Sequence, residues 1–152
     1  MPRSKRRFIA LLAPLLILFS ITVTGCGAAT PVAVHVPAMA SMADMPAEVK
    51  AAPIVAQQTY QFAMANPEVL KKLPCYCGCG KMGHTSNYNC YVKSAEGAKV
   101  IYDNHALGCS ICVDITQEAM RQLRQGKSVA DISRTIDTTF AKYGPSNMAP
   151  PP

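Results

Sequence analysis

Residues 74–80 read Pro-Cys-Tyr-Cys-Gly-Cys-Gly, so three cysteines stand at alternate positions within one short stretch. In an extended chain, residues two apart lie roughly 6.7 Å from each other on one face. Thiolates that share a zinc ion must approach to under about 4 Å, because each Zn–S bond is about 2.3 Å long. The chain must therefore curl here, and Gly78 and Gly80 would allow it, because glycine enters left-handed backbone regions without steric cost. A curled loop of this kind can close on a metal ion.

Three further cysteines and two histidines follow this loop. Together they make eight candidate metal ligands: Cys75, Cys77, Cys79, Cys90, Cys109, Cys112, His84 and His105. Thiolates and imidazoles favour zinc or monovalent copper and disfavour magnesium and calcium. A histidine in a loop can also be an ordinary hydrogen-bonding residue, so both interpretations stay open for His84 and His105. The pattern predicts one or two soft metal ions.

The same six cysteines also fit a disulfide framework, because their number is even. Bridges among Cys75, Cys77 and Cys79 would be strained, because a disulfide requires particular separations of its two backbone positions. Each of the three would have to pair with one of the later cysteines, which leaves several connectivities open. In that case the cysteines are structural, and the protein is a disulfide-stapled interaction module.

The pair Cys109-Ser-Ile-Cys112 has a third interpretation, because it stands where we expect a helix to begin. Partial positive charge at a helix N-terminus lowers the pKa of a thiol and favours the thiolate. A thiolate suits metal binding and thiol-disulfide exchange equally well. Cys109 and Cys112 are therefore also the candidate redox pair of a thiol-disulfide oxidoreductase.

Working outward, local signals predict a helix before the cysteine loop and a short strand after it. The helix covers residues 55–65, and Asn66 caps a continuation whose first helical residue is Pro67. The strand covers residues 99–102, whose length suggests at most an edge piece.

Two more helices are predicted after the loop. Residues 109–125 form the first, which Gly126 ends, and residues 128–143 form the second, which opens on a near capping box at Ser128. The apolar stripe of the first helix consists of Ile111, Ile115, Ala119 and Leu123. The stripe of the second consists of Val129, Ile132, Ile136, Phe140 and Tyr143. Stripes at this spacing indicate core packing.

The fold class is thus mainly α, a small three-helix domain with a Cys/Gly-rich loop region, after a signal peptide and a flexible tether. We assign residues 1–25 to the signal peptide, 26–53 to a lipidated cysteine and a flexible Ala/Pro/Met linker, 54–145 to the Cys-rich helical domain, and 146–152 to a disordered tail. A domain of this size has a thin core, so metals or disulfides are often needed to stabilise it.

The N-terminus predicts export. Residues 3–7 carry four basic side chains and precede an almost unbroken apolar run over residues 8–23, which is the order of a secretion signal. Residues 23–26 read Val-Thr-Gly-Cys, the pattern of a bacterial lipobox, in which Cys26 takes the lipid. A retained transmembrane helix is the alternative, but the run is shorter than the ~20 residues needed to span hydrocarbon. We expect lipid anchoring at the extracytoplasmic face of a bacterial membrane.

Removal of this signal changes the charge of the protein. The full chain has a net charge of +6, but the signal contains four of its fifteen basic residues and none of its nine acidic ones. The mature chain therefore carries eleven basic and nine acidic residues, a net charge of +2. No remaining run of Lys or Arg suggests a phosphate-binding surface, so nucleic acid is not an expected partner.

Residues 74–80, together with His84, Cys90 and the sequence His-Ala-Leu-Gly-Cys-Ser-Ile-Cys at 105–112, resemble the PCYCGC-motif lipoproteins. The resemblance spans roughly residues 54–144, and the lipobox and linker fit it too. It implies an extracytoplasmic, lipid-anchored protein of largely uncharacterised activity. It supports the architecture and leaves the function open.

A second resemblance covers residues 109–144, where Cys-x-x-Cys, a helix, Gln-Gly-Lys-Ser and another helix are similar to the thiol-reducing subunits of cytochrome c maturation. That resemblance implies a three-helix bundle in which Cys109 and Cys112 exchange disulfides with an apocytochrome. The chain departs from those subunits by four extra cysteines, by a lipid anchor in place of a membrane helix, and by the lack of an apolar segment after the domain.

The leading hypothesis is therefore a lipid-anchored protein that binds or handles copper or zinc and passes it to a metal-receiving protein. Copper is the narrower hypothesis, because Met39, Met42 and Met45 recur at every third position and thioethers are soft ligands. Enzyme activity is less favoured, since no Ser-His-Asp pattern, nucleophile elbow, phosphate loop or paired carboxylate stands out. If the chain is an enzyme, it is a thiol-disulfide oxidoreductase.

Overall fold

The computed structural model describes residues 36–97 and 99–149. The predicted signal peptide, Cys26 and the first part of the predicted linker lie outside these residues. Within the described ranges, no helix is both long and apolar enough to cross a membrane.

The three predicted helices are present as α2 (Ile54–Ala65), α4 (Ser110–Arg124) and α5 (Val129–Phe140). Between the last two, the backbone turns at Gly126, whose φ of 73° favours glycine. Ser128 caps α5 as predicted, because its hydroxyl accepts a hydrogen bond from the backbone N–H of Asp131 at 3.1 Å. The described part of the chain is mainly helical, as expected.

Two short helices flank α2. The first, α1 (Ala47–Lys50), precedes it, and the second, α3 (Pro67–Leu70), follows it with Pro67 at its first position. Asn66 does not cap α3 with its side chain; its amide instead donates to the carbonyl oxygens of Phe62 and Ala38, both at 2.8 Å. The predicted cap therefore ties α2 to the segment before it.

A β-hairpin pairs β1 (Val92–Glu96) with β2 (Lys99–Tyr102) in antiparallel order, with Ala95 opposite Val100. The strand predicted over residues 99–102 is thus confirmed. Its partner β1 was not predicted, because Val-Lys-Ser-Ala-Glu has no alternation of apolar and polar residues and only Val92 is buried.

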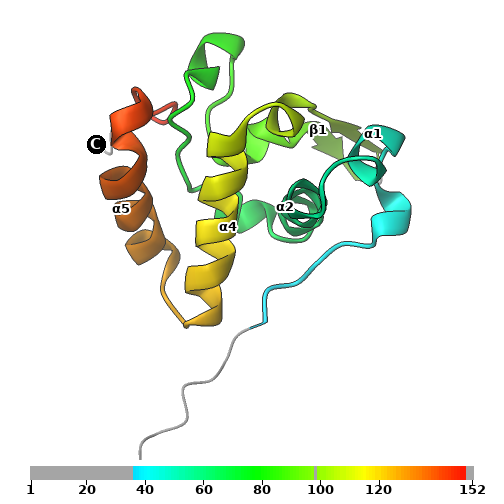
Figure 1. The fold of residues 1–152 in the computed structure, drawn as a ribbon, viewed down its shortest axis with the longest axis horizontal. Coiled ribbons are helices and arrows are strands. Elements are labelled where there is room, and N and C mark those ends of the chain that lie inside the picture. The colour runs from blue at the N-terminus through cyan, green and yellow to red at the C-terminus, as the bar shows by residue number, and fades with distance from the viewer. Residues whose placement is uncertain (1–35, 98, 150–152) are drawn as a thin grey trace, which may run out of the picture. The chain divides into compact units, whose positions relative to one another are not determined.

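The core forms where α4 packs against α5 on one side and against α2 on the other (Figure 1). Ile115 and Ala119 of α4, and Ile132 and Ile136 of α5, are fully buried. Tyr143, predicted as the end of the α5 stripe, is 53% exposed, because α5 ends at Phe140 and a 3₁₀ turn (Ala141–Tyr143) follows. The predicted stripe is therefore core only as far as Phe140.

The segment before α2 differs from the flexible linker predicted for residues 26–53. In its described part, Met45 and Val49 are buried in the hydrophobic core, and the backbone N–H of Ala40 donates to the carbonyl of Gln61 at 3.0 Å. The Ala/Pro/Met composition concealed this, because apolar residues spaced without a clear period give no pattern to interpret. Residues 40–53 belong to the folded domain.

Candidate metal centre

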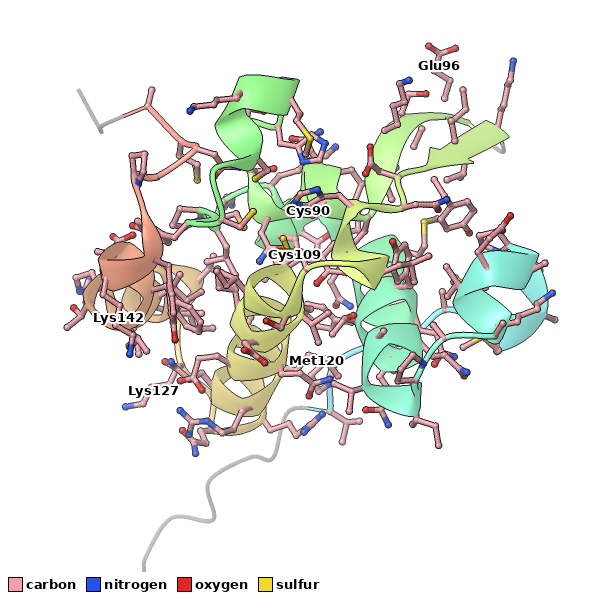
Figure 2. All side chains as sticks on the ribbon, turned by 45° about the horizontal axis from the view of Figure 1, so that its top comes forward. Cys90, Glu96, Cys109, Met120, Lys127 and Lys142 are labelled. Carbon is pink, nitrogen blue, oxygen red and sulfur yellow. The ribbon has the colours of Figure 1, made fainter. Side chains whose placement is uncertain are left out.

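All eight predicted ligands converge at the N-terminal end of α4. They come from the loop at residues 74–80, from the 3₁₀ turns Cys79–Met82, Asn87–Cys90 and His105–Leu107, and from the start of α4. Figure 2 shows Cys90 and Cys109 at this end of α4, whereas Lys127 lies beyond the opposite end. The fold thus gathers residues that are up to 37 positions apart, such as Cys75 and Cys112.

One group of donors consists of Cys77, His105, Cys109 and Cys112, whose ligand atoms all lie within 4.8 Å of one another. Cys77 Sγ is 3.3 Å from His105 Nε2 and 3.6 Å from Cys112 Sγ. We call these four residues the outer group, because all but Cys112 are partly exposed. Three thiolates and one imidazole are a common ligand set for tetrahedral zinc.

A second group consists of Cys79, His84 and Cys90, whose ligand atoms also lie within 4.8 Å of one another. The sulfur atoms of Cys79 and Cys90 are 3.8 Å apart. We call these three the inner group, because their exposed fractions are only 1%, 9% and 0%. His84 Nδ1 is buried and has no hydrogen-bond partner among the described residues, and a buried polar atom without a partner needs an explanation. A metal ion would supply one.

Cys75 lies between the two groups. Its Sγ is 3.4 Å from Cys77 Sγ and 3.4 Å from Cys112 Sγ, both in the outer group. It also lies within 4.8 Å of Cys79 Sγ and of Cys90 Sγ in the inner group. The sulfur of Cys75 therefore joins the groups into one continuous cluster.

The cysteine loop curls as predicted, although only one of its two glycines supplies the bend. Gly78 has a φ of 83°, the left-handed conformation that favours glycine. Gly80 does not adopt a positive φ; instead, a Cβ added there would lie 3.5 Å from Asn147 Cβ. Gly80 therefore marks a close approach of the chain end and not a second left-handed turn.

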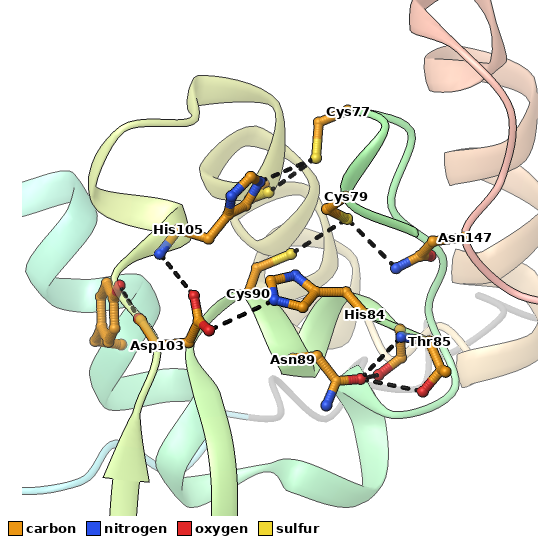
Figure 3. Close-up of polar contacts among 12 residues, drawn as sticks. Cys77, Cys79, His84, Thr85, Asn89, Cys90, Asp103, His105 and Asn147 are labelled. Carbon is orange, nitrogen blue, oxygen red and sulfur yellow. Dashed lines mark hydrogen bonds and ion pairs between the residues drawn. The ribbon is translucent and has the colours of Figure 1, made fainter. Parts of the chain in front are cut away.

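Asp103 contacts both histidines, which the sequence did not reveal. One carboxylate oxygen lies 3.5 Å from His84 Nε2 and the other accepts the backbone N–H of His105 at 2.8 Å, as Figure 3 shows. Its carbonyl oxygen accepts the hydroxyl of the buried Tyr60 at 2.6 Å. A carboxylate behind a metal-binding histidine fixes the ring and its tautomer. Asp103 therefore holds His84 with Nδ1 as the free donor.

Asn147 ties the end of the chain to the cysteine loop, although residues 146–152 were predicted to be disordered. Its Oδ1 accepts the backbone N–H of Cys75 at 2.7 Å, and its own N–H donates to the carbonyl of Cys75 at 3.0 Å. Its Nδ2 lies 3.5 Å from Cys79 Sγ (Figure 3). The sequence offered no signal for this contact, because a single Asn before Ala-Pro-Pro-Pro resembles any frayed end.

The crowded thiols differ in acidity. A hydrogen bond from the Cys112 thiol lowers the pKa of Cys75 to about 2, with a further contribution from Cys90. The same hydrogen bond raises the pKa of Cys112 above its usual range. Burial, followed by the negative charge of Cys75, raises the pKa of Cys77 and of Cys79. The cluster alone therefore favours one thiolate, and a cation would be needed to ionise the others.

None of the six cysteines in the described residues forms a disulfide. The closest sulfur atoms are 3.4 Å apart, well beyond the S–S bond length of about 2.05 Å. The structure differs here from the three-bridge framework and agrees with a cluster of Cys and His groups that can hold a metal ion.

Comparison with known proteins places this cluster within one family. Searches of curated proteins and of solved structures found no match to the chain, and no similarity to the cytochrome c maturation subunits emerged. The profile of one family, "Protein of unknown function with PCYCGC motif", matches residues 15–152. Because this match spans most of the sequence, including every residue of the cluster, the chain belongs to the PCYCGC-motif family.

Proposed function

We propose that the chain is a lipid-anchored, extracytoplasmic protein that binds soft metal ions, zinc or monovalent copper, through its Cys/His cluster. The observation that carries the proposal is the convergence of six unpaired thiols and two imidazoles, one of which has a buried nitrogen without a partner among the described residues. Burial of His84 Nδ1 without a partner among the described residues is costly, and a cation bound to this nitrogen would remove the cost.

Thiolate softness supports copper as much as zinc, whereas the spaced methionines support copper less than the sequence suggested. Met45 is 3% exposed and Met42 packs against the core, which leaves only Met39 substantially exposed. These side chains fill space at the edge of the domain, as methionine often does. The compartment supports a tightly bound soft ion of either kind, because thiols outside the cytoplasm otherwise oxidise; copper stays the narrower proposal through the exposed thioether of Met39.

The test is mass spectrometry of the full chain, purified from membranes in detergent without added reductant. We expect bound metal together with six reduced thiols at the cluster, and copper or zinc titration should show much tighter binding than a variant with all six cluster cysteines changed to Ser. The matched control is Ser110→Ala, which changes an exposed residue between Cys109 and Ile111. Reduced, folded protein that binds neither ion more tightly than this six-serine variant would overturn the proposal.

The lipid anchor rests on the sequence at residues 3–26, where basic residues, an apolar run and Val-Thr-Gly-Cys follow in order. Export to the outer face would bring the cluster close to metal ions and to a metal-receiving protein outside the cytoplasm. Metabolic labelling with a radioactive fatty acid should mark the wild-type chain and not Cys26→Ser. Equal labelling of both chains would contradict lipidation at Cys26.

A second candidate function, thiol-disulfide exchange by Cys109 and Cys112, is favoured by one observation. Cys109 is the partly exposed N-cap residue of α4, and its Sγ lies within 4.8 Å of that of the buried Cys112. This is the usual arrangement of an attacking and a resolving thiol. A redox titration against glutathione tests it: a pair that exchanges near the potential of the compartment supports the oxidoreductase, and a pair that stays reduced and metal-bound refutes it.

A further inference from the structure

The cluster contains more donors than one metal ion can use. A tetrahedral zinc site takes four protein ligands, and the outer group of Cys77, His105, Cys109 and Cys112 already supplies four within 4.8 Å of one another. Cys75 and the inner group are then left over. These remaining donors need their own explanation.

The remaining donors form a second set of the same composition. The inner group supplies Cys79, Cys90 and His84, and its missing fourth ligand has an obvious source in Cys75, whose Sγ lies within 4.8 Å of both inner sulfur atoms. Each set then contains three thiols and one imidazole. Asp103 contacts a histidine of each set: the ring of His84 and the backbone N–H of His105.

The two sets differ in their access to solvent. The inner residues are at most 9% exposed, whereas Cys77, His105 and Cys109 are each partly exposed. An open pocket of about 530 Å³ reaches the imidazoles of both His84 and His105, with Lys93 and Asn104 on its walls. The pocket touches one histidine of each set, but among the ligands of the described residues only the outer set has partly exposed members, so an incoming ligand meets the outer set more readily than the buried inner set.

From these observations we propose that the cluster holds two ions of unlike exchange rate: a retained ion on Cys75, Cys79, His84 and Cys90, and an exchangeable ion on Cys77, His105, Cys109 and Cys112. This two-ion proposal rests on the proposed metal-binding function and deepens it. The inner ion stabilises the loops that carry the outer ligands. The outer ion is the one passed to another molecule.

Transfer proceeds by ligand exchange without a change of oxidation state. An acceptor thiol loses its proton as its sulfur bonds to the outer ion, and the sulfur of Cys109 leaves the ion and takes up a proton. Repetition of this exchange at Cys77 and Cys112, with release of His105, moves the ion to the acceptor. The acceptor is thus a molecule that presents several cysteine thiolates.

The test uses the full chain in detergent, loaded with ¹¹³Cd²⁺ as a soft stand-in whose resonance position reports its sulfur ligands. We expect two ions per chain and two resonances, each in the range of three sulfurs and one nitrogen. Excess EDTA should remove one ion at least about tenfold faster than the other, because release of the buried ion requires local opening of the loops. These measurements on the wild type do not depend on how any variant folds.

Variants then assign the two ions. Cys109→Ser should lose the fast ion and its resonance and keep the slow one, while His84→Ala should lose the slow ion; Ser110→Ala should keep both. A single ion per chain would overturn the two-ion proposal and leave the proposed function standing, whereas no bound ion would overturn both. Two ions that leave at one rate would refute the distinction between a retained and an exchangeable ion.

Discussion

The pair of helices α4 and α5 and the loop region at residues 74–108 are stabilised by different forces. The helices bury Ile115, Ile132 and Ile136 completely, and a turn at the positive-φ Gly126 joins them, so apolar burial and local signals suffice to explain them. The loop region is built largely from 3₁₀ turns and a two-stranded hairpin, and its buried residues include three of the six cluster thiols, those of Cys75, Cys79 and Cys90. We expect such a region to depend on an ion bound to its cysteines, as small metal-binding domains commonly do.

Metal removal should separate the two regions most strongly. A structural zinc ion contributes on the order of 10 kcal/mol of binding free energy to small metal-dependent domains. We therefore expect a strong chelator to increase amide hydrogen exchange over residues 74–108, while the amides at the centres of α4 and α5 stay protected. Hydrogen exchange with mass spectrometry measures both regions in one sample. Uniform loss of protection would show that the helices depend on the metal as much as the loops do.

Ile136→Ala should produce the opposite pattern. This side chain of α5 is fully buried, and removal of a buried isoleucine's outer carbons costs about 2–5 kcal/mol. Denaturant unfolding of the metal-loaded chain should report this loss, with the metal content per folded chain unchanged. A variant that loses metal without losing stability would contradict the division between the two regions.

Asp103→Asn tests whether the carboxylate of Asp103 positions His84 for metal binding. The amide oxygen can still accept the backbone N–H of His105, but the carboxylate that faces His84 Nε2 at 3.5 Å is gone. Loss of a carboxylate behind a metal-binding histidine weakens metal affinity about 10–100-fold. Competition with a chelator of known affinity measures the change, and Asn104→Ala, at an exposed neighbour, is the control. Equal affinities of the two variants would refute the positioning role.

The affinity for metal should rise with pH. Burial raises the pKa of Cys77 and of Cys79, and the hydrogen bond to Cys75 raises that of Cys112. These thiols are protonated at neutral pH, so a binding ion must displace their protons, and each displaced proton makes affinity rise about tenfold per pH unit. Zinc titrations at pH 6, 7 and 8 with a pH-insensitive competitor check this. A flat profile would mean that the thiols are already ionised without metal.

The smallest effect is expected from Ser128→Ala, which removes the cap of α5. The hydroxyl of Ser128 accepts the backbone N–H of Asp131 at 3.1 Å, and loss of such a cap costs about 1 kcal/mol. Stability should fall by that amount in denaturant unfolding, with no change in metal affinity. Thr138→Ala, at an exposed site within the same helix, is the comparison and should change stability less.

Local features made the helices predictable. The stripe from Val129 to Phe140 repeats at helical spacing, Ser128 provides the cap, and Gly126 provides the turn before it, and all of these act between residues a few positions apart. Segments without such local signals were misjudged. Residues 40–53 and Asn147 pack onto the domain through contacts with Gln61 and Cys75, which are distant in the sequence.

By itself, the sequence determined the three main helices, the strand at residues 99–102 and the identity of the eight soft donors, because residue chemistry and short-range spacing carry that information. Only the tertiary structure decided which donors share a group, that Cys75 lies between the groups, and that Asp103 contacts the ring of His84 and the backbone of His105. These relations depend on how the loops pack against α4. Ligand geometry is a property of distances between remote residues, and a linear sequence does not contain those distances.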